Sequence, residues 1–370
     1  MMSYTHIAGT FLIDADGSFL NGAGLGDGED RNVTVVKTLR EGRYKIPYVS
    51  AQAWKRWLRN TAVEENGWNP SILKAIDLNE KGNTNKIAGE LNPVEFPEDD
   101  LFGYMEAKAK DSKKDSDDEE TASDSKSKTK VKPIIRASPF VASILKGIRK
   151  TGNLTIDEGF VHLKEGTPQP YKTQFYSTAM QGVFCIDCER VGVFNNCGDR
   201  IELDENKAKA FMEKGQISEK EVEDEKKGWK VYQLADLQKE REKRIAGLLK
   251  ALSVLRGGAK QAAFGTDVTP KVMILAAVDC GIPIFNRLFD QENELTMNVE
   301  ALKEVIKDYR DRIDGKVYIG LRKGFVSNED EIRKLAADDS DFKDILEIGS
   351  PIEITEKFNK EVLMIENSRK

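Results

Sequence analysis

The residues best suited to chemistry are seven cations crowded between Val36 and Asn60. This stretch carries a single acid, Glu41, so its local charge is +6, whereas the whole chain has a formal net charge of −6. Clustered cations attract phosphate groups whatever the average charge of the protein. The sequence therefore predicts a polyanion-binding strip made of Lys37, Arg40, Arg43, Lys45, Lys55, Arg56 and Arg59.

A helix is predicted to position three of these seven cations. Ser50 is a typical N-cap residue and Pro47 precedes it, so the helix should begin at Ala51. At 100° per residue, one face collects Trp54, Trp57, Leu58 and Thr61, and the other collects Gln52, Lys55, Arg56 and Arg59. The first face should pack on a core, and the second should either bind a ligand or be merely solvated. Val33 to Val49, before the helix, has the pattern of a hairpin that turns at residues 40–43.

The order of the remaining elements predicts the fold class. Residues 6–15 form an alternating strand that leads into a glycine-rich loop at 17–28, which is either simply flexible or a phosphate cradle. An amphipathic helix at 235–255 ends at Gly257-Gly258, and residues 272–278 form a buried strand. With a strand pair at 173–194, these elements give an α+β chain with the ferredoxin-like βαββαβ order of RNA-recognition domains.

The rest of the chain divides into insertions and an extension. We expect residues 1–279 to form the palm, and residues 106–130, which are almost free of apolar side chains, to be a disordered loop. A short helical run should end at Arg149, a projecting hairpin or loop should span about 151–172, and a charged helical insertion about 203–230. Residues 280–370 should be an extension packed on the palm, with a helix at 296–313, a strand at 317–321, a helix at 330–335 and a polar tail.

Composition narrows the classes of function. The 370 residues are 39% hydrophobic, with no apolar run of membrane-spanning length and no signal peptide, which predicts a cytoplasmic protein with no membrane partner. One C-x-x-C is present, Cys185 and Cys188, but residues three apart on a strand point to opposite faces and no second pair exists. We interpret the cysteines as structural thiols and expect no metal and no cofactor.

Five motifs stand out along the chain. They are Phe19-Leu-Asn21, Lys45-Ile-Pro-Tyr-Val-Ser-Ala-Gln-Ala-Trp-Lys-Arg-Trp-Leu-Arg59, Arg136-Ala-Ser-Pro139, Gln174-Phe-Tyr-Ser-Thr178 and Gly258-Ala-Lys-Gln261. In the same order, they resemble motifs of the backbone subunit of the Cascade CRISPR effector, and the resemblance covers roughly Thr5 to Asp279. The form of Pro47 to Trp54, of Gly257-Gly258-Ala and of Thr266 to Pro270 is most similar to the DevR or autoregulator branch of type I-B systems.

The resemblance implies a modified RNA-recognition palm with finger and thumb insertions. Copies would polymerise along a CRISPR RNA, contact other Cascade subunits and support target DNA recognition in antiviral defence. The RNA-binding residues implied by the resemblance or predicted from the strip are Asn21, Arg43, Lys45, Ser50, Gln52, Lys55, Arg56, Arg59, Arg136, Lys260 and Gln261. In the implied thumb, Phe160, Val161, His162 and Leu163 either insert between bases or pack on their own hairpin.

Two other classes remain as alternatives. A RAMP-type endoribonuclease, for guide processing or target RNA cleavage, would use a loop aspartate such as Asp27 or Asp30, or the two histidines His6 and His162. No sequence feature brings these residues together as an acid–base pair, so we expect a non-catalytic protein. A DNA-binding regulator has no support, since no helix-turn-helix pattern occurs.

Overall fold

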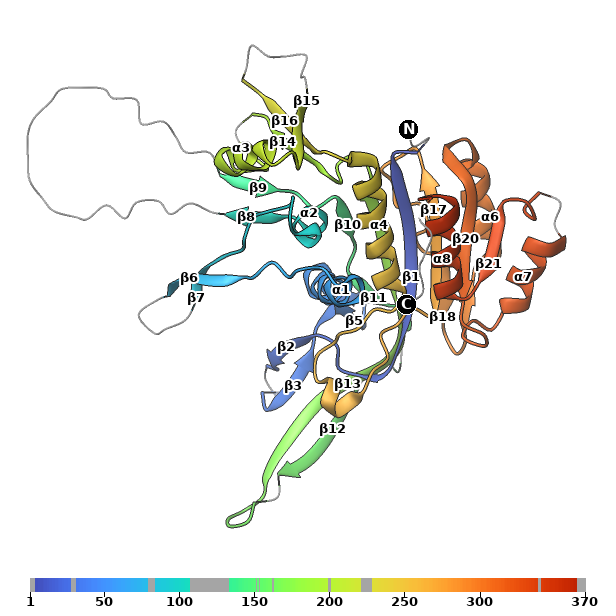
Figure 1. Cartoon of the computed structure of the whole chain (residues 1–370). Helices are drawn as coiled ribbons and strands as arrows, with labels where there is room; N and C mark the ends of the chain where they lie inside the picture. Colours follow the sequence, from blue (N-terminus) through green and yellow to red (C-terminus); the bar gives the residue numbers. More distant parts are fainter. Residues whose placement is uncertain are drawn as a thin grey trace, which may run out of the picture. The chain divides into compact units, whose positions relative to one another are not determined.

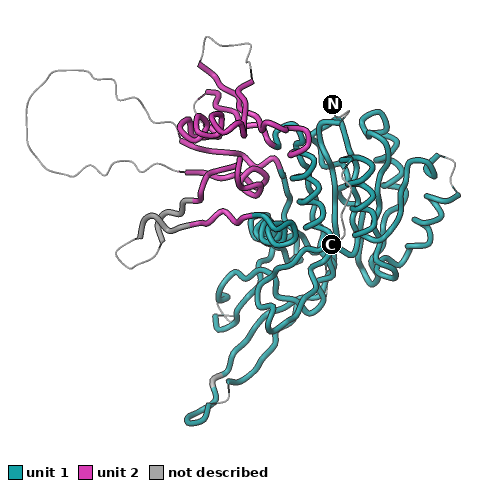
Figure 2. Tube along the Cα trace, viewed as in Figure 1, with its two compact units in different colours: residues 1–68, 140–191, 241–370 teal, residues 69–139, 192–240 magenta. Residues whose placement is uncertain are grey.

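The computed structural model describes residues 4–27, 31–78, 84–106, 133–150, 152, 154–161, 163–198, 201–220, 228–338 and 341–364 (Figure 1). The chain divides into two compact units, coloured in Figure 2. Unit 1 comprises residues 1–68, 140–191 and 241–370, and unit 2 comprises residues 69–139 and 192–240. The loop predicted to be disordered, 106–130, lies outside the described residues except for Glu106.

Unit 1 is built on the predicted ferredoxin-like arrangement. Its central strands follow the order β17-β1-β13-β11, and all neighbours are antiparallel. Along the chain, helix α1 lies between β1 and β11, directly after β5, and α4 precedes β17. The bounds are β1 His6–Ser18, α1 Ala51–Asn66, β11 Leu145–Gly147, β13 Gln169–Asp187, α4 Leu237–Ser253 and β17 Val272–Val278. The α+β class and the βαββαβ order are therefore confirmed.

The same sheet continues on both sides of this core. Strands β20 (Ile313–Leu321) and β21 (Leu346–Gly349) follow β17, while β5 (Tyr44–Val49) and β4 (Thr38–Glu41) follow β11. Strands that pair outside this path are β2 Gly22–Leu25, β3 Val33–Val36, β10 Phe140–Ala142 and β12 Leu154–Val161. The helical run predicted before Arg149 is wrong, because β10 and β11 both pair with β13 there. Pairing with a long neighbouring strand overrides local helix preference.

Helices cover the two faces of the sheet. On one face Phe11 of β1 meets Trp54 of α1, with ring centroids 5.3 Å apart, and α8 (Pro351–Glu361) contacts α4 through a hydrogen bond from Asn359 to the Ala246 carbonyl. On the other face Leu12 shares a core with residues of α6 (Val299–Asp308) and α7 (Glu329–Asp338). The predicted helix-strand-helix order of the C-terminal region is confirmed, although β21 and α8 were not predicted. Short elements are α5 Gln261–Phe264, β18 Phe289–Gln291, β19 Leu295–Met297 and a 3-10 turn at Arg310–Arg312.

Unit 2 has a small core of its own around Phe194, Leu203, Phe211 and Tyr232. Its elements are β6 Lys74–Leu78, β7 Thr84–Ala88, α2 Pro97–Phe102, β8 Tyr104–Glu106, β9 Ile134–Arg136, β14 Val193–Asn196, α3 Glu205–Glu213, β15 Ile217–Lys220 and β16 Lys230–Leu234. The insertion expected to be helical at about 203–230 contains one helix, α3, and two strands of a three-stranded sheet. Along β16 the buried Tyr232 and Leu234 flank the half-buried Gln233, which is the alternation of a strand. An interpretation based on charge alone misses this pattern.

Arg136 is buried at the centre of unit 2. Its guanidinium is only 2% exposed, pairs with the Asp100 carboxylate, and donates to Glu202 Oε2 at 2.8 Å and to the Val193 carbonyl at 2.9 Å. It also lies 4.9 Å from the centroid of the Phe194 ring. This burial corrects the expectation that Arg136 contacts RNA, because its own unit encloses the cation.

We predict that Arg136→Met destabilises the protein strongly. Removing the cation takes an ion pair away from two buried carboxylates, a change that costs about 3–5 kcal/mol. Equilibrium urea unfolding measures the effect, and the exposed Arg56→Met serves as control, with an expected change within about 0.5 kcal/mol. If Arg136→Met unfolded at the same urea concentration as the control, the ion pairs would not contribute to folding.

Candidate nucleic-acid interface

Helix α1 begins where the sequence predicts. Ser50 occupies the N-cap position with extended dihedrals (φ −62°, ψ 148°), and its carbonyl accepts from the amides of Ala53 and Trp54 at 3.0 and 3.2 Å. Its hydroxyl makes no capping hydrogen bond, so that group does not satisfy the first-turn amides as expected. The helix ends at Gly67, whose φ of +61° suits glycine.

The two predicted faces of α1 are largely confirmed. Trp54, Leu58 and Thr61 are buried, and the Trp54 indole donates to the Ser143 carbonyl at 2.8 Å. On the opposite side Gln52 and Arg56 are exposed, and Arg59 is half-buried. The helix is therefore fixed to the sheet by one face and turns polar and cationic side chains outward with the other.

Lys55 differs from its neighbours. Its ammonium donates to the Phe140 carbonyl at 2.9 Å and lies 5.6 Å from the centroid of the Phe140 ring. Burial lowers the pKa of Lys55 to about 8. Lys55 stands at the edge of the core-facing stripe, about 60° around the helix from Leu58, which explains why it folds back against the protein. In this position the ammonium fixes α1 to β10 and is not presented outward.

A glycine loop packs tightly against α1. The half-buried Trp57 indole lies so close to Gly257 that an added Cβ there would overlap it, and the backbone φ of +149° also favours glycine. The Arg256 amide donates to the Thr61 hydroxyl at 3.2 Å. The Ala259 amide in turn donates to the Leu20 carbonyl at 3.0 Å. Three segments far apart in sequence, residues 19–21, α1 and residues 256–261, therefore meet.

Lys260 and Gln261 hold this loop in place. Lys260 has a left-handed backbone (φ +50°), and its ammonium donates to Thr173 Oγ1 at 3.0 Å while lying 4.7 Å from the Phe19 ring centroid. The side-chain amide of Gln261 donates through Nε2 to the Gly257 carbonyl. Both residues lie beside the Asn21 segment. Among the described residues nothing donates to Asn21 Oδ1, and the Asn21 carbonyl accepts from the Lys37 amide at 2.9 Å.

The β4–β5 hairpin distributes its cations over two faces. Val49 pairs with Leu145 on the α1 side of the sheet, so the alternation of a strand places the exposed Lys45 on that side too. Arg43 lies in the turn, where its guanidinium donates to the Tyr44 hydroxyl at 3.0 Å and stands 5.1 Å from the Tyr44 ring centroid. The predicted strip therefore does not form one continuous surface.

The predicted projecting hairpin is present. Strands β12 and β13 pair antiparallel from Leu154 opposite Tyr176 to Val161 opposite Gln169 (Figure 1). Phe160, Val161 and Leu163 are 62%, 47% and 49% exposed. Each of these side chains is only partly covered, so the choice between packing on the hairpin and inserting between bases stays a prediction. His162 lies outside the described residues.

Two of the four residues considered for RNA cleavage, His6 and Asp27, lie in described parts of the chain, one in β1 and the other in a loop. His6 Nδ1 is 2.8 Å from the Thr5 hydroxyl, Asp27 is exposed on a loop, and Asp30 is not described. No group of three or more His, Cys, Asp or Glu side chains has metal-binding geometry within the residues that the structure covers. Burial raises the pKa of the Cys185 thiol to about 12, as expected for a structural thiol. No helix in the described ranges is long and apolar enough to cross a membrane.

Comparison with known proteins identifies the fold. No family model matches this sequence, and no curated protein matches it. Solved structures do match: a chain of a "CRISPR RNA-guided surveillance complex" has a TM-score of 0.51 at 13% identity and covers 96% of this chain and 99% of that chain. A chain of a "CRISPR RNA-guided surveillance complex, pre-nicking" has a TM-score of 0.56 at 12% identity, covering 97% and 100%. Over nearly its whole length, this chain has the fold of subunits found in those assemblies.

Proposed function

We propose that this protein is a non-catalytic backbone subunit of a Cascade-type CRISPR surveillance complex. It would bind the guide RNA through its sugar-phosphate backbone, polymerise with further copies along that RNA, and support recognition of target DNA in the cytoplasm. The observation that carries the proposal is the junction of α1, the Asn21 segment and the Gly257–Gln261 loop. The sequence motifs favour the DevR branch of type I-B systems within this class.

The chemistry of the junction suits a polyanion of any sequence. Arg56 and Gln52 are exposed on α1, Lys45 is exposed on the neighbouring strand, and the glycine backbone of the loop permits close approach. Cations, amides and glycine backbones bind phosphate and ribose without reading base edges. A guide-binding subunit requires this, because the spacer sequence differs from one guide to the next.

The β12–β13 hairpin fits the role of a thumb. Phe160 and Val161 leave 62% and 47% of their surface exposed. Exposed apolar side chains on a protruding element are typical of contacts with another molecule. We infer that the hairpin contacts a neighbouring copy or the strand bound to it.

We predict that Arg56→Gln with Arg59→Gln weakens RNA binding equally for guides of unrelated sequence. Each lost phosphate contact reduces the slope of log affinity against log salt by about 0.7 for a single strand, so the double variant should lose about 1.4. Fluorescence anisotropy over a range of salt concentrations measures the slope.

The matched control is Arg333→Gln with Lys334→Gln, which also removes two cations, from α7 on the opposite face of the sheet. It should retain the wild-type slope. Equal slopes for both double variants would remove α1 from the binding surface, and a loss that depended on guide sequence would argue for base readout.

We predict that the purified protein leaves both guide and target RNA intact in the presence of magnesium or manganese. The sequence shows no sign of an acid–base pair, and no group of three or more His, Cys, Asp or Glu in the described residues could hold a metal ion, which is the reason for this expectation. Gel electrophoresis of end-labelled RNA measures cleavage. Products that disappear in Asp27→Ala or His6→Ala would favour the endoribonuclease alternative.

A further inference from the structure

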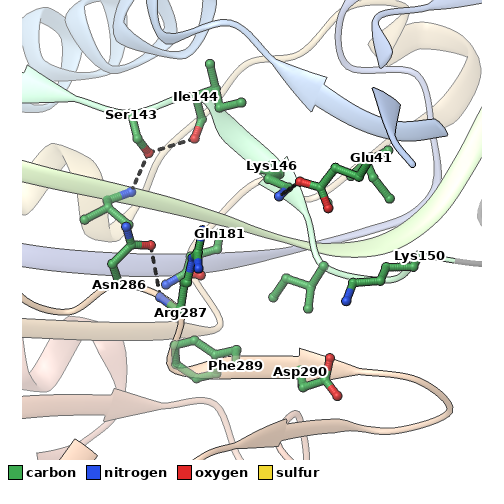
Figure 3. Close-up of a pocket in the computed structure, with 14 residues that line it drawn as sticks. Glu41, Ser143, Ile144, Lys146, Lys150, Gln181, Asn286, Arg287, Phe289 and Asp290 are labelled. Carbon is green, nitrogen blue, oxygen red and sulfur yellow. Dashed lines mark hydrogen bonds and ion pairs between the residues drawn. The ribbon is translucent and has the colours of Figure 1, made fainter. Parts of the chain in front are cut away.

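A pocket opens on the sheet face opposite α1. It has a volume of about 680 Å³, and its floor is formed by β4, β5, β11 and β13 (Figure 3). Glu41 forms an ion pair with Lys146 across this floor, and Gln181 lies beside them. Asn286 and Arg287 of the loop before β18 form one wall together with Phe289 of β18, and Lys150 stands on another side. All of these residues belong to unit 1.

Strand β5 carries two aromatic side chains onto this same face. Lys146, in the floor, pairs with Tyr48, and Glu41, also in the floor, pairs with Tyr44. Because paired residues share a face and side chains alternate along a strand, Tyr44, Ile46 and Tyr48 all project to the pocket side. Both tyrosines are half-buried, so part of each ring is available for contact.

The charged side chains that line the pocket are Glu41, Lys146, Lys150, Arg287 and the exposed Asp290, which leaves one excess positive charge. In the described part of the chain, the exposed ammonium of Lys150 and the exposed guanidinium of Arg287 have no charged partner. Arg287 has a left-handed backbone (φ +54°), stabilised by a hydrogen bond from its amide to its neighbour Asn286 Oδ1 at 3.0 Å. A bulky residue at positive φ is strained, and such strain is concentrated at functional sites. Arg43, stacked on Tyr44, adds a third cation at the rim.

We propose that this face, defined by Tyr44, Tyr48, Lys150 and Arg287, binds a second, single-stranded nucleic acid. Aromatic rings that stack on bases, next to cations that contact phosphates, are the usual means of binding unpaired strands. The floor lies on the sheet face opposite α1, the face whose aromatic side chains stack on unpaired bases in RNA-recognition domains. Helices α6 and α7 cover another part of this face, over β1 and β17. A duplex is excluded because its bases are not available for stacking on the tyrosines.

The proposed strand is distinct from the guide. Lys45 and α1 lie on one side of the sheet, and Tyr44, Tyr48 and the pocket lie on the other. The pocket volume of about 680 Å³ is within the usual range for sites that take a small molecule or one nucleotide unit. Ribose and deoxyribose strands share the required chemistry, namely phosphates and base faces, so the experiment separates these two sources.

The test measures binding of a fluorescein-labelled oligothymidylate and an oligouridylate, each of about 15 nucleotides, to the full chain. Each oligonucleotide is titrated with and without saturating unlabelled guide RNA. We expect binding that persists when guide is present. Tyr44→Leu with Tyr48→Leu should weaken this binding by about tenfold or more, because base stacking is lost. Lys150→Gln with Arg287→Gln should lower its salt slope by about 1.4.

Two controls separate this inference from the proposed function. Arg56→Gln with Arg59→Gln should weaken guide binding and leave the second strand unaffected, and Arg333→Gln with Lys334→Gln should change neither. Thermal unfolding of every variant confirms that a loss of binding is not a loss of fold. Binding of each oligonucleotide to the sheet face is also measured without guide RNA. This measurement can support or contradict the second-strand proposal whether or not the guide-binding proposal holds.

Persistence of oligothymidylate binding alone would assign the site to DNA, and persistence of oligouridylate binding alone would assign it to RNA. Equal affinities would mean that the face does not distinguish the sugars. The proposal is overturned if neither strand binds, if guide RNA displaces both completely, or if the tyrosine and cation variants bind as tightly as the Arg333→Gln, Lys334→Gln control.

Discussion

The contact between the Gly257 backbone and the Trp57 indole is the constraint on which the candidate interface depends. Any side chain at residue 257 would overlap the indole. The backbone φ of +149° at this residue also disfavours every residue type except glycine. Trp57 is held by α1, which is fixed to the sheet by the buried Trp54. The glycine loop is therefore positioned by the packing of a helix face, and it brings Lys260 to the base of the β12–β13 hairpin.

The charge distribution of the protein follows from the same arrangement. A chain with net charge −6 can bind a polyanion only if its cations gather locally, and α1 with β5 achieves this on one side of the sheet. The fold does not place every cation there. Arg136 neutralises two buried carboxylates in unit 2, and Lys55 binds the Phe140 carbonyl, so each stabilises its own unit. The same residue types thus serve either a surface or a core, depending on which carboxylates and carbonyls surround them.

Much of the fold follows from local sequence, because periodicity and caps depend on neighbouring residues. The start of α1 at Ala51, the end of α4 before Gly257 and the buried β17 were all predictable in this way. The strands β10 and β11 were not, because only pairing with β13 makes them strands. Burial of Arg136 was equally hidden, since Asp100 and Glu202, its partners, lie far from it in sequence. For the interface, charge and glycine patterns indicated the segments, whereas the division of cations between two sheet faces required the register of β4 with β5.

Hydrogen–deuterium exchange of the full protein with and without RNA tests most directly whether the three joined segments bind a sugar-phosphate backbone. Residues 19–21, residues 51–60 and residues 256–261 should gain protection together on RNA binding. The gain should be the same for two RNAs of unrelated sequence, because phosphate and ribose are common to both. Protection confined to other segments, or protection in these three that depends on RNA sequence, would contradict the account.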